Sequence, residues 1–103
     1  MPDFIPQAHQ IREDRSLLLD YINSVYPESM AEEVLLDVMV SLPNSSPTDH
    51  TRRDLAYLQA RGLVEPSMQK RPGQINQVKR WTLTAKGLTF IEHNKPWSEL
   101  EVF

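Results

Sequence analysis

The sequence contains no cysteine. A disulfide bond, a zinc site with thiolate ligands and a cysteine nucleophile are therefore excluded. A chain without disulfides suits a reducing compartment, so we expect a cytoplasmic protein. The first ten residues, MPDFIPQAHQ, include two prolines and an aspartate and lack the continuous apolar run of a signal peptide. We therefore expect no secretory segment there.

Long apolar runs and catalytic signatures are also missing. No apolar stretch approaches the length of a membrane-spanning helix, so we expect no membrane partner. The three histidines, His9, His50 and His93, lie far apart and lack partners at helical spacing, so we expect no metal site. The sequence has no glycine-rich phosphate loop, no HExxH motif and no Ser–His–Asp order. We therefore expect a protein that is not an enzyme and that uses no cofactor.

The charge of the chain is unevenly distributed. The 103 residues are 40% apolar and carry a net charge of −3, which fits one ordinary domain with a single core. Residues 1–50 hold nine acidic and two basic side chains, whereas residues 51–86 hold eight basic and two acidic ones. This division favours a polyanion on one face of the molecule. Ordinary solvated surface charge is the alternative.

Apolar spacing predicts two helices in the acidic half. The first covers residues 13–25 after an irregular arm of residues 1–12. The second starts at Ser29, which forms a capping box with Glu32, and ends before Pro43. Its apolar face comprises Val34, Leu35, Val38, Met39 and Leu42. Because Leu36 and Val40 lie off that face, we expect this helix to be buried on most sides.

A third helix is predicted over residues 47–61. Ser46 is the expected N-cap, and Pro47 is the expected first helical residue, where its missing N–H has no cost. Gly62 is placed to adopt the left-handed conformation that closes a helix. This helix therefore starts and stops at recognisable signals.

The remaining residues predict a hairpin and a last helix. Residues 63–83 form two strands joined by a long polar tip with a Pro-Gly turn. Trp81 and Leu83 alternate inward on the second strand. Thr84 then caps a helix over residues 85–93.

The order helix, helix, helix, hairpin, helix is accompanied by two motifs. They are Leu55-x-x-Leu58-x-x-Arg61-Gly62-Leu63-Val64 and Trp81-x-Leu83-Thr84-x-x-Gly87. Together they resemble the winged helix-turn-helix family of small bacterial and phage-type transcriptional regulators. The resemblance covers residues 13–93 and leaves a tail of residues 94–103. It implies an α+β fold, mainly α, with a three-helix bundle, a β-hairpin wing and a C-terminal helix.

Double-stranded DNA is the partner that this resemblance implies. Helix 47–61 would enter the major groove, and wing 65–80 would lie on the backbone or in the minor groove. The candidate DNA-binding residues are Thr48, His50, Arg52, Arg53, Tyr57, Lys70, Arg71, Gln74, Lys79 and Arg80. One of the two adjacent arginines can read guanine while the other binds phosphate.

Two acidic residues in the same helix weigh against tight DNA binding. Asp49 lies near the positive end of the helix dipole and suits capping. Asp54 either pairs with a neighbouring arginine or accepts a hydrogen bond from cytosine. An adaptor that binds proteins through its acidic, apolar second helix is the alternative function.

The apolar residues of the tail predict an interface. They are Trp97, Leu100, Val102 and Phe103, which a small domain should not leave exposed. They either fold back on the first helix or meet a second subunit. Because winged-helix regulators usually dimerise through terminal helices, we expect a two-fold homodimer with recognition helices about one DNA turn apart.

Overall fold

The structure is a computed structural model that describes residues 4–42, 47–70, 72–73 and 77–93. The element order is α1 (Phe4–Ser24), β1 (Met30–Ala31), α2 (Glu32–Ser41), α3 (Thr48–Ala60), β2 (Val64–Lys70), β3 (Gln77–Leu83) and α4 (Ala85–His93). These residues thus form four helices and one three-stranded antiparallel sheet. The predicted α+β class, mainly helical, is confirmed at this level.

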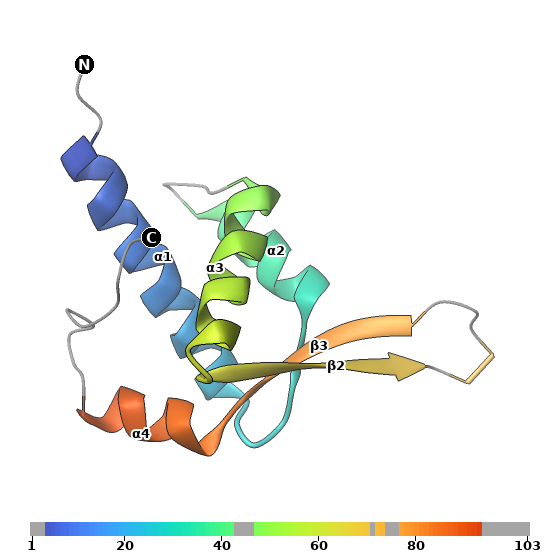
Figure 1. Cartoon of the computed structure of the whole chain (residues 1–103). Coiled ribbons are helices and arrows are strands. Elements are labelled where there is room, and N and C mark those ends of the chain that lie inside the picture. Colours follow the sequence, from blue (N-terminus) through green and yellow to red (C-terminus); the bar gives the residue numbers. More distant parts are fainter. Residues whose placement is uncertain (1–3, 43–46, 71, 74–76, 94–103) are drawn as a thin grey trace.

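Three helices pack together above the sheet, and α4 lies on the other side of it (Figure 1). The hairpin of β2 and β3 projects away from this body. The core is formed by buried side chains of the four helices and of β3, including Leu18, Ile22, Leu35, Met39, Leu55, Leu58, Trp81, Leu83 and Ile91. No helix among the described residues has both the length and the apolar character needed to cross a bilayer.

Helix α1 begins at Phe4 instead of residue 13. Residues 4–12 are therefore helical, and the expectation of an irregular arm there is wrong. Pro6 falls in the first turn, where backbone N–H groups have no partner within the helix, so a proline is tolerated. Residues 1–3 lie outside the described residues.

The expected capping box at the start of α2 is absent. Ala31 is the N-cap residue and makes no side-chain cap bond. Ser29 instead accepts a hydrogen bond from Arg80, and Glu32 accepts one from the indole of Trp81. Both partners lie on β3, which pairs with the short strand β1. Pairing with a distant strand has therefore replaced the local cap.

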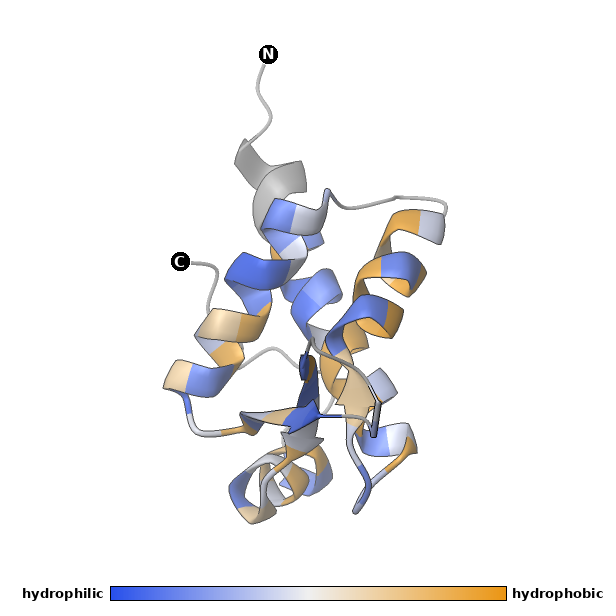
Figure 2. Cartoon of the chain, turned by 90° about the vertical axis from the view of Figure 1, so that its right-hand side faces the viewer, coloured by the Kyte–Doolittle hydropathy of each residue, from blue (hydrophilic) through white to orange (hydrophobic). Residues whose placement is uncertain are grey.

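Helix α2 has an open apolar side. Leu35 and Met39 are buried as predicted, and Leu36 is buried with them. Val34 and Val40 are 47% and 48% exposed, so the expectation of burial on most sides is wrong. Figure 2 shows hydrophobic segments along most of α2.

The C-terminus of α3 closes as predicted. Gly62 has a φ of 77°, in the left-handed region. Its N–H donates to the carbonyl of Gln59, and the N–H of Leu63 donates to the carbonyl of Leu58. This pair of bonds is a Schellman motif, which satisfies carbonyls that the helix leaves free. The motif turns the chain directly into β2.

The hairpin has a regular register and two unlike halves. Val64 lies opposite Leu83 at its base, and Lys70 lies opposite Gln77 toward its tip. Trp81 and Leu83 are buried, which confirms their predicted inward alternation. Toward the tip, β2 and β3 are largely exposed. The base of the hairpin is therefore part of the core, whereas its outer half is a projecting arm.

Thr84 and Gly87 join α4 to the end of α3. The Thr84 Oγ1 accepts from the N–H of Gly87 at 2.9 Å, which confirms the predicted cap, and donates to the carbonyl of Gly62 at 2.6 Å. A Cβ on Gly87 would overlap the carbonyl oxygen of Leu63 and approach Leu83 Cδ1 to 2.7 Å. The glycine of the second motif therefore permits close packing of α4 on the hairpin base.

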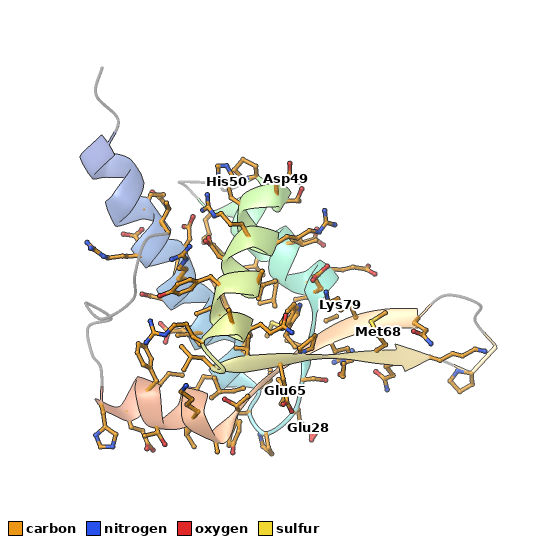
Figure 3. The ribbon with its side chains drawn as sticks, in the orientation of Figure 1. Glu28, Asp49, His50, Glu65, Met68 and Lys79 are labelled. Atoms are coloured by element: carbon orange, nitrogen blue, oxygen red, sulfur yellow. The ribbon has the colours of Figure 1, made fainter. Side chains whose placement is uncertain are left out.

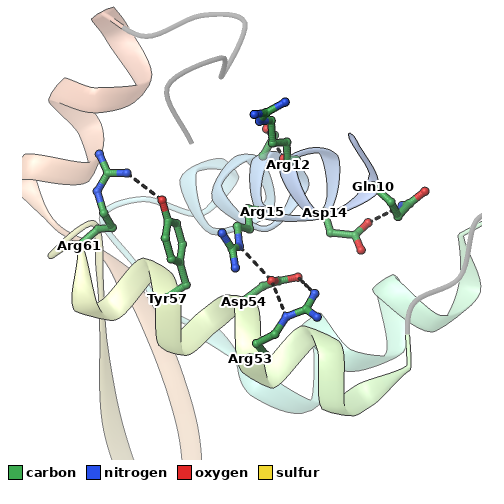
Figure 4. Close-up of polar contacts among 9 residues, drawn as sticks. Gln10, Arg12, Asp14, Arg15, Arg53, Asp54, Tyr57 and Arg61 are labelled. Carbon is green, nitrogen blue, oxygen red and sulfur yellow. Dashed lines mark hydrogen bonds and ion pairs between the residues drawn. The ribbon is translucent and has the colours of Figure 1, made fainter. Parts of the chain in front are cut away.

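A buried ion pair fixes α1 against α3 (Figure 4). Arg15 Nε lies 3.0 Å from Asp54 Oδ1, with side-chain exposures of 1% and 0%. Arg53 Nε lies 3.2 Å from the same oxygen. Two roles were expected for Asp54, and the structure shows the first, pairing with the neighbouring Arg53. The distant Arg15 pairs with the same carboxylate. The carboxylate is thus turned into the molecule and away from the exposed side of α3.

We expect Gly87→Ala to destabilise the protein. Alanine normally improves a helix interior by about 1 kcal/mol, but overpacking against the hairpin base costs about 1–3 kcal/mol. The net effect should be a lower midpoint of thermal unfolding followed by circular dichroism. Thr89→Ala, at an exposed position of α4, is the control and should change the midpoint little. A Gly87→Ala protein as stable as the parent would contradict the close approach.

We expect Asp54→Ala to lower the free energy of unfolding by about 3–5 kcal/mol, because the buried charge of Arg15 loses the carboxylate that balances it. Asp37→Ala, on the exposed side of α2, removes the same charge and should stay within about 0.5 kcal/mol of the parent. Urea titration measures both values. Equal losses for the two variants would show that the buried pair does not fix α1 on α3.

Candidate nucleic-acid interface

Helix α3 presents one strip of exposed side chains. Thr51, Asp54, Leu55 and Leu58 are buried, and these positions define the inner face of the helix. Arg52 and Arg53 lie on the outer side, with 57% and 42% of their side chains exposed. The helix thus keeps Leu55, Leu58 and Asp54 inside. Both arginines are exposed, and the Arg53 guanidinium is also hydrogen-bonded to Asp54.

The start of α3 carries polar residues. Pro47 is the N-cap residue, so the helix starts at Thr48, one residue later than predicted. Ser46, the predicted N-cap, lies outside the described residues. Thr48, Asp49 and His50 are exposed. Figure 3 places Asp49 and His50 at the end of α3 that is remote from the hairpin. These residues therefore border the exposed strip on the side away from the hairpin.

Glu32 joins α3 to the hairpin. Arg52 Nε lies 3.7 Å from Glu32 Oε2, and Lys79 Nζ lies 3.9 Å from Glu32 Oε1. The indole Nε1 of Trp81 donates to Oε1 at 3.0 Å. One carboxylate at the start of α2 thus brings a cation of α3 and a cation of β3 together. No local pattern could indicate this contact, because the partners of Glu32 lie 20 to 49 residues further along the chain.

Strand alternation places Lys79 and Arg80 on opposite faces of the hairpin. Lys79 shares its face with Trp81, and its ammonium lies 5.1 Å from the centre of that ring. Lys70 lies on this same face, because it pairs with Gln77, two residues before Lys79. The hairpin therefore presents two lysines on one face.

Arg80 is a structural residue in this fold. Its Nε donates to the hydroxyl of Ser29 at 2.6 Å, and its Nη2 donates to the carbonyl of Ser29 at 2.9 Å. The side chain is half-buried and faces the segment of β1. Both bonds hold it on the face opposite Lys79, so its expected role as a DNA contact stays a prediction that this geometry does not favour.

Tyr57 is also used in packing. The guanidinium of Arg15 lies 3.7 Å from the centre of its ring, and Arg61 Nη1 donates to its hydroxyl at 2.8 Å (Figure 4). The side chain is half-buried against the core. Tyr57 therefore faces α1 and not the exposed strip of α3, so its expected role as a DNA contact stays a prediction that this geometry does not favour.

The sequence-predicted residues thus fall into three groups. Six are exposed: Thr48, His50, Arg52, Arg53, Lys70 and Lys79. Tyr57 and Arg80 are held by contacts within the protein. Arg71 and Gln74 lie outside the described residues. Glu32 was not among the candidates, although it contacts two of them.

Searches for metal-binding groups in the described residues and for known relatives of the chain both give no result. Across the described part of the chain, no group of three or more histidine, aspartate or glutamate side chains could hold a metal ion. Comparisons with protein-family models, curated proteins and solved structures give no match. A functional interpretation therefore depends on the charges and geometry of the molecule itself.

Two arginine substitutions separate a half-buried, hydrogen-bonded cation from an exposed one in a loose ion pair. Arg80→Ala removes two hydrogen bonds of a half-buried guanidinium and should lower the free energy of unfolding by about 1.5–3 kcal/mol. Arg52→Ala removes an exposed pair at 3.7 Å and should cost less than about 1 kcal/mol. Urea titration distinguishes them. A larger loss for Arg52→Ala would contradict this assignment.

Proposed function

We propose that this protein is a winged helix-turn-helix protein that binds double-stranded DNA, as a transcriptional regulator. In this proposal α2 and α3 form the helix-turn-helix, and the hairpin of β2 and β3 is the wing. The main support is the meeting of Arg52 and Lys79 at Glu32, because it puts a cation of the reading helix and a cation of the wing on one surface.

The exposed strip of α3 has suitable chemistry for the major groove. A helix fits that groove, and arginine can donate two hydrogen bonds to guanine. Arg52 and Arg53 are the candidates for this role. Asp49 can accept a hydrogen bond from the amino group of cytosine. Asp54 adds no repulsion at this surface, because it is buried between Arg15 and Arg53.

The wing has suitable chemistry for the sugar–phosphate backbone. Lys70 and Lys79 lie on the face of the hairpin that is directed toward α2 and α3. In Figure 3, Glu28 and Glu65 lie on the other side of the hairpin from Lys79. This separation keeps these two carboxylates away from the lysines that would contact phosphate, so Glu32 is the carboxylate that pairs with Lys79. Arg71 and Gln74 remain candidates from the sequence alone.

A symmetric operator would require two copies of the chain. We propose a homodimer in which two α3 helices enter successive major grooves, about 34 Å apart. The apolar residues expected to form the interface, Trp97, Leu100, Val102 and Phe103, lie outside the described residues. The dimer therefore rests on the sequence.

One observation favours a second function, an adaptor that binds another protein. Val34 and Val40 are about half exposed on α2, and Glu33 and Asp37 are exposed beside them. Exposed apolar side chains with carboxylates at their edge suit a protein partner. DNA would be repelled from this side of α2, so the two functions use different surfaces.

Titration of labelled mixed-sequence duplexes tests the first proposal. Lys79→Ala should weaken binding to all duplexes alike and reduce the slope of log affinity against log salt by about 1. Arg52→Ala should weaken binding by about tenfold and relax sequence preference. If about five phosphates are contacted, a fourfold rise in salt should weaken binding of the parent roughly 500-fold.

Lys86→Ala is the matched control, because this lysine is exposed on α4 and its loss removes the same charge. Binding by this variant should stay within about twofold of the parent. No binding by the parent at micromolar concentration and low salt would refute DNA recognition. It would favour the adaptor.

A further inference from the structure

We infer that Glu32 competes inside the protein with DNA for Arg52 and Lys79. This inference rests on the proposed function and adds to it a residue that sets the affinity. The carboxylate pairs with Arg52, which would otherwise be available to a base edge, and with Lys79, which would otherwise be available to a phosphate. Glu32 would thus position the two cations in the free protein and lower the affinity for DNA.

The geometry allows exchange at both cations. Arg52 and Lys79 are 57% and 43% exposed, so each side chain can turn toward a bound polyanion. Their separations from Glu32, 3.7 and 3.9 Å, are those of loose surface ion pairs. Such pairs contribute little to stability. A phosphate contact that releases counterions from DNA is strong enough to replace them.

The carboxylate itself does not leave when the cations do. The indole of Trp81 donates to Glu32 Oε1 at 3.0 Å, and this bond does not involve either cation. Trp81 is buried, and the Glu32 side chain is only 16% exposed. Glu32 would therefore stay as a fixed negative charge beside the bound DNA. Arg52, Lys79 and Glu32 together would present a net charge of +1 to the DNA, whereas the two cations alone would present +2.

Glu32→Gln tests the charge and preserves the shape. The glutamine amide oxygen can still accept the bond from Trp81, whereas the negative charge is lost. We expect duplex binding to tighten about five- to tenfold, because a like charge next to the phosphates is removed. The slope of log affinity against log salt should steepen by about 0.9, equivalent to one further phosphate.

Glu33→Gln is the matched control. Glu33 is the next residue, is exposed, and forms no ion pair within the described residues. Its substitution changes the net charge by the same amount. If net charge alone has little effect, the affinity should stay within about twofold of the parent, and the salt slope within about 0.3. Equal tightening by both variants would overturn the inference, because a general field would then explain it.

A second test keeps the charge and moves it. Glu32→Asp shortens the side chain by one methylene and draws the carboxylate back from both cations, so we expect binding between that of the parent and Glu32→Gln. In an Arg52→Ala, Lys79→Ala background, only the repulsion between Glu32 and phosphate remains, so Glu32→Gln should tighten binding less than it does in the parent. A gain as large as in the parent would overturn the inference, because competition for the two cations would then contribute nothing. Thermal unfolding of each variant confirms that folded proteins are compared.

The results separate the two proposals. If the parent binds duplex and Glu32→Gln binds no more tightly, the role of Glu32 is wrong and DNA binding stands. If neither protein binds at low salt, both proposals are wrong. If only Glu32→Gln binds, DNA recognition by the parent is refuted, and with it the inference that rests on it.

Discussion

The buried ion pair of Arg15 and Asp54 is the constraint on which the arrangement of this molecule depends. It joins α1 to the inner face of α3, with both side chains almost fully excluded from solvent. A charged residue removed from water needs its partner in place, so the pair admits few alternative positions of α3. The outer side of α3 is then free, and Arg52 and Arg53 lie there.

A second carboxylate acts at the surface, where its effect is different. Glu32 links α2, α3 and the wing through two loose ion pairs and one bond from a buried indole. Its pairs are exposed and contribute little to stability. Their importance lies in position, because they hold cations of two elements on one side of the molecule. Asp54 thus fixes the scaffold, and Glu32 adjusts the surface that the scaffold presents.

Features with local causes were predictable from the sequence. Gly62 closes α3, and Thr84 caps α4, because each depends on residues close in the chain. Features that depend on distant partners were not predictable. The capping motif at Ser29 was replaced by a bond to Arg80, 51 residues away, and Tyr57 was turned inward by Arg15 and Arg61. Local patterns carry no information about such contacts.

The central claim is that α3 and the wing bind duplex together through one surface. Nuclear magnetic resonance of the ¹⁵N-labelled protein during titration with a duplex tests it most directly. Binding through this surface should shift the backbone amides of Arg52 and Lys79 and the indole N–H of Trp81, which contacts Glu32. The amides of Val34 and Val40 should not move. Shifts confined to α2, or no shifts at low salt, would contradict binding through this surface.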